Sequence, residues 1–350
     1  MSDSPRSGEP AATPRIRLVD VAREAGLSKT TVSAALNGTG RMSGAVRERA
    51  REAARRLGYR PNATARLLRA GHARLIGYAV GEFADDTGSY MSSPYFTQLT
   101  NATAAAALQH GYALVLLPSR RAPQEWADLP LDAAIVADPL DDDPLIEDFV
   151  AARIPLFTDR SVEGRPGTHW VDVNADGAVR EVLDHLREQG ARQTAVVLPG
   201  TLTRFHRAVA DTYRLWCAEH GAAPLLATTD GPGDGPVVAA VERLMDGPGP
   251  DALFVVAEAT PPLVLDAVRR SGRDVPRDLL LVCASEDASA EHSRPAVSTL
   301  SLRPAAVAVK GIELLMAALE SGSREPTGAL VPTVLEIRAS SVRAAPAPPA

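Results

Sequence analysis

Three short segments with the hydrophobic spacing of helices lie between residues 18 and 57, and only short turns separate them. The spacing predicts helices over 19–25, 29–36 and 45–57. Their apolar side chains are spaced to meet in one small core. The predicted core residues are Leu18, Val21, Ala22, Val32, Leu36, Val46, Ala50 and Leu57.

The turns between these segments contain residues that end and begin helices. Gly26 can adopt the left-handed conformation that ends a helix, and Ser28 can cap the next one. The Asn-Gly-Thr-Gly stretch at 37–40 breaks the second helix, Ser43 is a candidate cap for the third, and Gly58 ends it. Two short helices joined by a Gly-containing turn form a helix-turn-helix, whose second helix can lie in the major groove of DNA. The pattern alone is only moderately specific, because short helical hairpins also occur in structural roles.

Charge is distributed unevenly along the chain. The formal net charge is −6, but residues 15–72 contain thirteen Arg or Lys against four Asp or Glu, a net of +9. Residues 73–350 carry −14. A basic segment joined to an acidic body is the distribution expected of a nucleic-acid-binding head. On charge alone, a solvated Arg-rich helix surface explains the segment equally well.

From residue 74 onward, strand-like apolar runs alternate with helical patterns. This βαβ repetition predicts parallel sheets with helices on both faces, an α/β fold. Because about 270 residues are involved, two similar α/β lobes fit better than one very wide sheet. The apolar runs lie at 75–80, 113–117, 133–136, 155–157, 194–198, 252–256 and 279–283, and the helical patterns at 96–110, 145–152, 177–189, 208–220, 236–245, 262–271 and 304–320.

Composition also restricts the cellular location of the chain and the kinds of site that it can form. No stretch approaches the roughly 20 apolar residues of a membrane span, so no membrane partner is expected. The first residues have no apolar segment of the kind that directs secretion. The two cysteines, Cys217 and Cys283, are too few for a disulfide framework or a four-ligand zinc site. A reducing cytoplasm is therefore the expected location.

Signatures of enzymatic chemistry are missing from the sequence. It contains no Gly-x-Ser-x-Gly, no phosphate-binding Gly-x-x-x-x-Gly-Lys and no Gly-x-Gly-x-x-Gly after a strand. The Gly- and Pro-rich stretch at 231–236 suits a surface loop better than a phosphate cradle. No two of the seven histidines have the helical spacing of metal ligands, so each is interpreted as a surface or structural residue. We therefore expect no catalytic residues, no metal site, no cofactor and no enzymatic activity.

Two stretches of the first 62 residues resemble one known family. Residues 18–37 read LVDVAREAGLSKTTVSAALN, and residues 57–62 read LGYRPN. Both closely resemble the N-terminal head of the LacI/GalR family of bacterial transcriptional regulators. The likeness continues through nearly the whole chain, and its landmarks in the body are Arg74-Leu75-Ile76-Gly77, Asp138-Pro139-Leu140, residues 295–300 and residues 335–340.

The resemblance implies which residues contact DNA. Lys29 and Thr30 match positions that reach base edges, where lysine can donate to guanine and threonine can touch a thymine methyl. Thr31, Ser33 and Asn37 match positions that hold the backbone or nearby bases. Where the family often has Arg, this chain has Ala34, so its operator is expected to differ. Ordinary exposed helix surface is the alternative for the hydroxyl residues. The expected DNA-binding set is Lys29, Thr30, Thr31, Ser33, Asn37, Tyr59, Asn62, Ala65 and Leu68.

Residues 63–69 resemble the family's hinge helix, which orders on DNA. By position, Leu68 is the leucine that wedges into the minor groove, and Ala65 is the small residue that allows close approach. Seven residues cannot sustain a helix alone in water, so folding on binding is expected. Alternatively, Leu67 and Leu68 pack the hinge onto the body.

The resemblance also implies an effector cleft between two lobes, as in periplasmic sugar-binding proteins. The N-lobe would comprise about 74–171 with a crossover near 301–325, and the C-lobe about 172–298 with the terminal strand. Tyr95 or Phe96 would line the cleft mouth, although either could be a core anchor. The family's sugar-binding Arg aligns with Val209, and its carboxylates align with Glu258 and the stretch containing Ser285 and Glu286. Because these replacements remove the bidentate groups that favour polyol recognition, an ordinary sugar ligand is doubtful. Arg160, Arg204 or Arg207 could substitute for the missing Arg.

These observations together predict a domain organisation. We expect a disordered leader over 1–14, a helix-turn-helix domain over 15–60 and a hinge with linker over 61–73. A two-lobed effector-binding and dimerisation domain would cover 74–340, and a disordered tail 341–350.

The predicted function is that of a DNA-binding transcriptional regulator. It would be a ligand-responsive repressor that binds a pseudo-palindromic operator as a homodimer and responds to a small-molecule effector of unknown identity. Segments 97–108 and 264–268 are candidate interface elements, with burial against their own sheet as the alternative. A solute-binding protein without DNA activity or an α/β enzyme with a basic head remain alternative interpretations.

Overall fold

The structure is a computed structural model that describes residues 16–59, 72–81, 93–117, 129–140, 142–162, 164–246 and 249–343. The chain divides into two compact units, Met1–Ala73 and Arg74–Ala350, which are called the head and the body below. The expected leader, most of the hinge (including Asn62, Ala65 and Leu68) and residues 344–350 of the tail lie outside the described residues.

The head contains the helices that the sequence predicts, α1 (Leu18–Ala25), α2 (Lys29–Asn37) and α3 (Gly44–Leu57). Ser28 and Ser43 cap α2 and α3, because their hydroxyls accept from the backbone N–H of Thr31 and Val46. Gly26 and Gly58 follow α1 and α3 with φ of 61° and 64°, a region that favours glycine. These local signals confirm the predicted turns.

The core of the head is small and rich in alanine. Val21 and Val32 are fully buried at its centre, and Leu18, Leu36 and Leu57 pack against it from its edges. The predicted Val46 is only half-buried and lies outside this cluster. Ala25, Ala35, Ala53 and Ala54 belong to it instead, because their small side chains let the helices approach closely.

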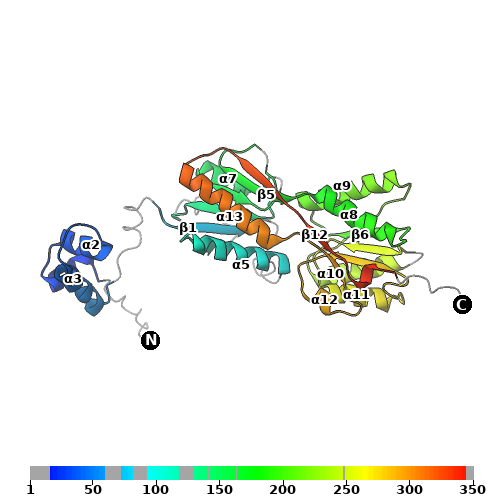
Figure 1. Cartoon of the computed structure of the whole chain (residues 1–350), viewed down its shortest axis with the longest axis horizontal. Coiled ribbons are helices and arrows are strands. Elements are labelled where there is room, and N and C mark those ends of the chain that lie inside the picture. Colours follow the sequence, from blue (N-terminus) through cyan, green and yellow to red (C-terminus); the bar gives the residue numbers. More distant parts are fainter. Residues whose placement is uncertain are drawn as a thin grey trace, which may run out of the picture. The chain divides into compact units, whose positions relative to one another are not determined.

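The body contains two parallel-stranded lobes, which confirms the predicted α/β fold (Figure 1). The N-lobe sheet has the strand order β11-β5-β4-β3-β1-β2. Helices α5 and α13 cover one face of this sheet and α7 the other, so each face has its own apolar core. The elements are β1 (Leu75–Val80), α5 (Pro94–Gln109), β2 (Ala113–Leu116), β3 (Ala133–Ala137), α7 (Pro144–Ala151), β4 (Leu156–Thr158), β5 (Thr168–Val173), α13 (Pro304–Ser321) and β11 (Thr327–Val331).

The C-lobe repeats this layered arrangement. Its sheet has the order β12-β10-β9-β8-β6-β7, in which only the β10–β12 pair is antiparallel among the described strands. Helices α8 and α9 cover one face, and α10 and α11 cover the other. The elements are α8 (Ala175–Glu188), β6 (Thr194–Leu198), α9 (Arg204–Glu219), β7 (Leu225–Thr228), α10 (Asp234–Met245), β8 (Ala252–Val255), α11 (Pro261–Arg270), β9 (Leu280–Ala284), α12 (Ser289–His292), β10 (Ser298–Ser301), β12 (Val334–Glu336) and the 3-10 helix η2 (Ala339–Ser341).

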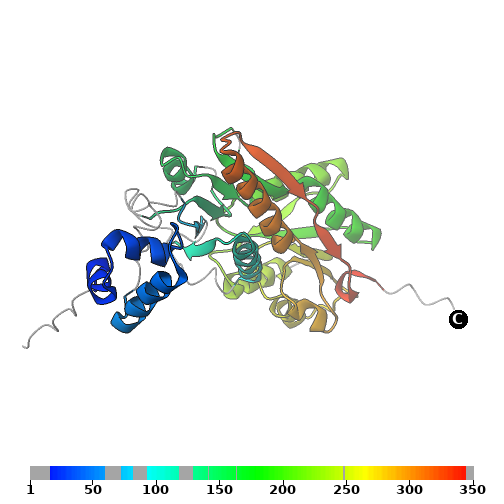
Figure 2. The same cartoon turned by 60° about the vertical axis from the view of Figure 1, so that its left-hand side comes forward.

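The chain passes between the lobes after β5, after β10 and after β11. Helix α13 belongs to the N-lobe and packs along α5, and the chain then runs through β11 and β12 back to the C-lobe (Figure 2). The crossover predicted to end near 325 therefore extends to Val331. Gly311 of α13 is required for this packing, since a Cβ there would lie 2.0 Å from the ring of Phe157.

Several elements differ from the prediction. Strands β5, β7, β10, β11 and β12 were not among the predicted apolar runs, since their sequences mix polar with apolar residues or lie at sheet edges. Helix α9 begins at Arg204, four residues before the predicted start. Residue 341 does not begin a disordered tail, because Ser341 is fully buried and its hydroxyl contacts His185 and Ser298. No helix in the described ranges has the length and apolar character needed to cross a bilayer.

Candidate DNA-binding surface and effector cleft

The N-terminal end of α2 is an exposed polar surface. Lys29 and Thr30 are exposed there, directly after the capping residue Ser28. The Ser28 hydroxyl lies 2.8 Å from that of Thr30 and 2.7 Å from that of Thr31. The helix end is thus held in place by its cap, while the Lys29 side chain is exposed and can reach a partner.

The other expected DNA-binding residues of the head are placed differently. Thr31 and Ser33 are half-buried, and Asn37 is exposed at the end of α2, where its amide donates to the Ser33 hydroxyl at 3.4 Å. Tyr59 is half-buried and packs against the head core. Its ring therefore has a structural role in addition to any role in binding.

A cavity of about 430 Å³ lies between the two lobes of the body. Its walls come from loops at the carboxyl ends of strands and from the first turns of α5, α9 and α10, the usual position of ligands in open α/β sheets. Six of the expected effector residues line it, but Arg207 does not, and its guanidinium donates to the Leu202 carbonyl. The six are Tyr95, Phe96, Arg160, Glu258, Ser285 and Glu286.

Arg160 lies at one wall of the cavity and is only 4% exposed. Its Nε is 3.4 Å from Oδ1 of Asp138, and its Nη1 donates to the Tyr95 hydroxyl at 2.9 Å. The guanidinium also lies 5.3 Å and 5.4 Å from the ring centres of Tyr95 and Phe205. These contacts fix the arginine within the protein, and both Asp138 and Asp159 neutralise its charge.

Burial dominates the titration of the groups around this arginine. Burial raises the pKa of Asp159 to about 6, even though Arg160 opposes the shift. Burial also raises the pKa of Tyr95, whose hydroxyl donates to Asp159 at 2.8 Å.

Asp138 has a φ of 43° at the end of β3, a left-handed conformation that aspartate tolerates better than most residues. Of the predicted landmark at 138–140, Asp138 is thus part of the cavity wall.

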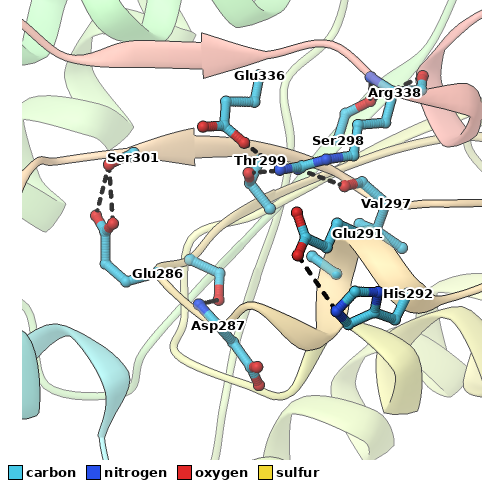
Figure 3. A network of polar contacts seen from close by, with 12 residues as sticks. Glu286, Asp287, Glu291, His292, Val297, Ser298, Thr299, Ser301, Glu336 and Arg338 are labelled. Atoms are coloured by element: carbon cyan, nitrogen blue, oxygen red, sulfur yellow. Dashed lines mark hydrogen bonds and ion pairs between the residues drawn. The ribbon is translucent and has the colours of Figure 1, made fainter.

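Hydrogen bonds join the lobes across the cleft. The Ser93 hydroxyl, which also caps α5, donates to Glu258 at 2.5 Å. The Gln98 amide donates to the backbone carbonyl of Glu286 at 3.1 Å. The Glu286 carboxylate is itself held by the Ser301 hydroxyl of β10 (Figure 3) and by the backbone N–H of Leu302. The relative position of the lobes is therefore coupled to the polar groups of the cavity.

Sequence reasoning missed two parts of this cavity. His206 was interpreted as a surface or structural residue, but it lines the cavity from the first turn of α9. The loop at 231–234 also lines it, before α10. For His206 the available signal was its position in the segment that follows the predicted strand at 194–198, whereas the loop at 231–234 follows β7, which the apolar runs did not predict. No cluster of His, Cys, Asp and Glu in the described part of the chain could hold a metal ion.

His206 is held as a neutral imidazole. The backbone N–H of Thr203 donates to its Nδ1 at 3.3 Å, which requires a lone pair on that nitrogen. Burial lowers the pKa of His206 to about 4, and Arg160 and Arg207 act in the same direction, while Asp138 opposes them.

The basic helical head and the two-lobed body with its cleft define a DNA-binding regulator that responds to a ligand. Two family models match the chain: bacterial regulatory proteins of the lacI family over residues 17–62 and a periplasmic binding protein-like domain over residues 183–341. The chain belongs to the LacI family of bacterial transcriptional regulators. This confirms the resemblance and the predicted function class.

Two related regulators support the assignment. The chain is 30% identical to the transcriptional regulator RafR of Escherichia coli over 67% of its length and 70% of RafR. It is 26% identical to the regulator CelR of Thermobifida fusca over 91% of its length and 96% of CelR. These relatives are named as transcriptional regulators, which argues against enzymatic activity.

Solved structures show the same fold. A CelR–cellobiose complex matches 93% of this chain and 100% of its own, with a TM-score of 0.67 and 25% identity. A lac repressor dimer bound to operator and the anti-inducer ONPF matches 94% and 100%, with a TM-score of 0.79 and 20% identity.

The neutral state of His206 predicts a pH dependence of stability. The unfolded histidine takes up a proton near pH 6.5 and the folded one only near pH 4, so stability is lost as the pH falls through this window. Because the side chain is partly exposed, solvent screens part of this effect. Between pH 7 and pH 5, the free energy of unfolding should therefore fall by about 1 kcal/mol more in the natural chain than in His206→Gln. Urea unfolding at both pH values measures it. The exposed His110→Gln should keep the natural response, and an equal response of all three proteins would contradict the assignment.

Proposed function

We propose that this protein represses transcription by binding a pseudo-palindromic operator as a homodimer, and that a small-molecule effector in the interlobe cleft controls this binding. The observation that carries the proposal is the exposed start of α2, with Lys29 and Thr30, in a segment of net charge +9. Operator binding requires access to the genome, so the protein acts in the cytoplasm, and it acts by binding and not by catalysis.

In this proposal α2 is the recognition helix. Lys29 donates to guanine O6 and N7, and Thr30 contacts a neighbouring base or a thymine methyl. Thr31, Ser33 and Asn37 hold the phosphate backbone and set the position of the helix. Tyr59 and Asn62 lie at the start of the hinge and contribute contacts beside the recognition helix. Ala34 presents only a methyl group, so the base opposite it is read by shape or apolar contact.

The hinge adds a second contact in the minor groove. Leu68 would insert between base steps at the operator centre, and Ala65 would allow the close approach of the two hinges. Partial unstacking of a base step is costly, and contacts to the bent duplex offset that cost. The two residues lie outside the described part of the chain, so this role rests on the resemblance of 63–69 to the family's hinge helix.

Dimerisation is supported by the surface of the N-lobe. Leu108 near the end of α5 is 65% exposed, and Leu116 on the edge strand β2 is 45% exposed. No other described strand pairs with the outer edge of β2, and large apolar side chains near such an edge favour association with a second chain. In the C-lobe the candidate segment 264–268 mostly faces its own core, because Val264, Leu265 and Val268 are fully buried or nearly so.

Effector control follows from the interlobe hydrogen bonds. A ligand that changes the Ser93–Glu258 or Gln98–Glu286 contact prefers one lobe arrangement, and only such a preference can shift the population of conformations. The lobe angle then changes the spacing of the two hinges in the dimer. Operator affinity therefore depends on effector binding.

Selection of binding sites from random duplex DNA by the purified full chain tests the proposal directly. We expect enrichment of a pseudo-palindrome, because a two-fold symmetric dimer places two recognition helices on equivalent half-sites. A single half-site without a symmetric partner would contradict the dimer. No enrichment would contradict sequence-specific binding.

Lys29→Ala tests the recognition helix. Removal of the ammonium should relax base preference at one position of each half-site by roughly 1–3 kcal/mol, measured by titration of single-base operator variants. The other lysine of the chain, Lys310 on α13, supplies the control, and Lys310→Ala should leave base preference unchanged. An unchanged preference in Lys29→Ala would remove this residue from the readout.

Leu68→Ala tests the hinge. Loss of the apolar wedge should weaken binding to the selected operator by about tenfold or more and leave non-specific binding nearly unchanged, because only the operator complex includes the unstacked step. Fluorescence anisotropy on operator and scrambled duplexes measures both. Leu67→Ala is the neighbouring control, and equal losses on both duplexes would show that Leu68 packs the hinge onto the body.

A further inference from the structure

Acidic residues outnumber basic ones in the described lining of the interlobe cavity. Five carboxylates contribute to its wall, and the only arginine or lysine among the lining residues that the structure describes is Arg160. The carboxylates come from different elements, the ends of β3, β8 and β9 and the start of α10, so they surround the space. They are Asp138, Asp234, Glu258, Glu286 and Asp287.

The one cation of the wall is already neutralised. Arg160 lies between Asp138 and Asp159, with distances of 3.4 Å and 3.5 Å, and the rings of Tyr95 and Phe205 lie beside its guanidinium. The guanidinium therefore contributes little net positive charge that could attract an anionic ligand. His206, the histidine among the described lining residues, is kept neutral by burial, and its Nδ1 accepts from the backbone N–H of Thr203.

The remaining carboxylates are held by neutral groups. Glu258 accepts from the Ser93 hydroxyl, Glu286 from Ser301 and the Leu302 backbone, and Asp234 from Thr260. Burial raises the pKa of both Glu258 and Glu286. For Glu258 the carboxylates of Asp138 and Glu286 raise it further. A positive charge in the cavity would relieve both the desolvation and this repulsion.

Asp138 already has a cationic partner, Arg160. The residue is 4% exposed, it lines the cavity, and its Oδ1 has no hydrogen-bond donor within the described residues, although Arg160 Nε lies 3.4 Å away. Buried carboxylate oxygens are nearly always hydrogen-bonded in folded proteins. Here the ion pair with Arg160 takes the place of that hydrogen bond, so the carboxylates available to a ligand are those of Glu258 and Glu286.

We propose that the cleft binds a small molecule with a protonated amine, such as an amino sugar or a short aliphatic amine, in preference to neutral or anionic molecules of the same shape. The inference rests on the proposed effector role of the cleft and names its ligand class. The ammonium lies beside Glu258 and Glu286, and the body of the ligand contacts the apolar lining contributed by Phe96, Val256 and Leu302.

Matched ligands that differ in charge test the inference. Calorimetric titration of the full chain at pH 7 compares glucosamine, glucose and glucose 6-phosphate, and then putrescine, 1,4-butanediol and succinate. In at least one series the amine should bind about tenfold more tightly than its neutral counterpart, and the anion should bind most weakly. A neutral or anionic compound that binds as tightly as the amine would overturn the inference while leaving the effector role intact.

A conservative variant links the preference to the cleft. Glu258→Gln keeps the size of the side chain and removes its charge, so amine binding should weaken by about tenfold while any binding of the neutral compound changes little. Glu320→Gln, an exposed change on α13, is the control and should bind as the natural chain does. Equal amine affinity in both variants would overturn the inference. If neither amine binds while the protein still selects an operator, the inferred ligand class is wrong, and the DNA-binding function stands.

Discussion

The buried ion cluster of Arg160 with Asp138 and Asp159 is the constraint on which the effector cleft depends. Burying an arginine is costly unless its charge is paired, and here Asp138 at the end of β3 and Asp159 after β4 supply the pairing. Tyr95 joins α5 to the cluster through its hydroxyl. Three separate segments of the N-lobe are thereby held around one guanidinium, which gives the cavity a rigid wall.

The C-lobe wall is held differently. Its carboxylates accept hydrogen bonds from hydroxyls and backbone N–H groups, and two of its residues also bond to the N-lobe through Ser93 and Gln98. Such contacts are weaker than the ion cluster and can be exchanged for contacts with a ligand. The combination of a rigid wall and an exchangeable one suits a cleft whose lobe angle responds to what it binds.

In the head, the residues that stabilise the fold are largely different from the residues proposed to bind DNA. The small alanine-rich core holds three short helices together, and the caps Ser28 and Ser43 satisfy their first N–H groups. Lys29 and Thr30 are exposed beside the Ser28 cap and outside this core. Under the proposed function, changes at these positions therefore alter which DNA is bound without altering the fold, whereas Tyr59 belongs partly to the core.

The sequence alone determined the head and the alternating architecture of the body. Gly26, Ser28, Ser43 and Gly58 act on their own neighbours, so their roles were readable from spacing. Buried parallel strands such as β3 and β6 are continuous apolar runs and were found in the same way. The membership of six expected residues in one cavity was also inferred, although only from the family resemblance.

Only the tertiary structure decided which distant residues meet. His206 lies in the cavity and Arg207, one residue later, does not, because successive residues of α9 point in different directions. Ser341 is part of the C-lobe because it contacts His185, more than 150 residues away in the sequence. The acidic character of the cavity likewise arises from residues on four separate segments. Local sequence propensity does not determine such contacts, because they depend on how the two sheets and the connections between the lobes bring distant segments together.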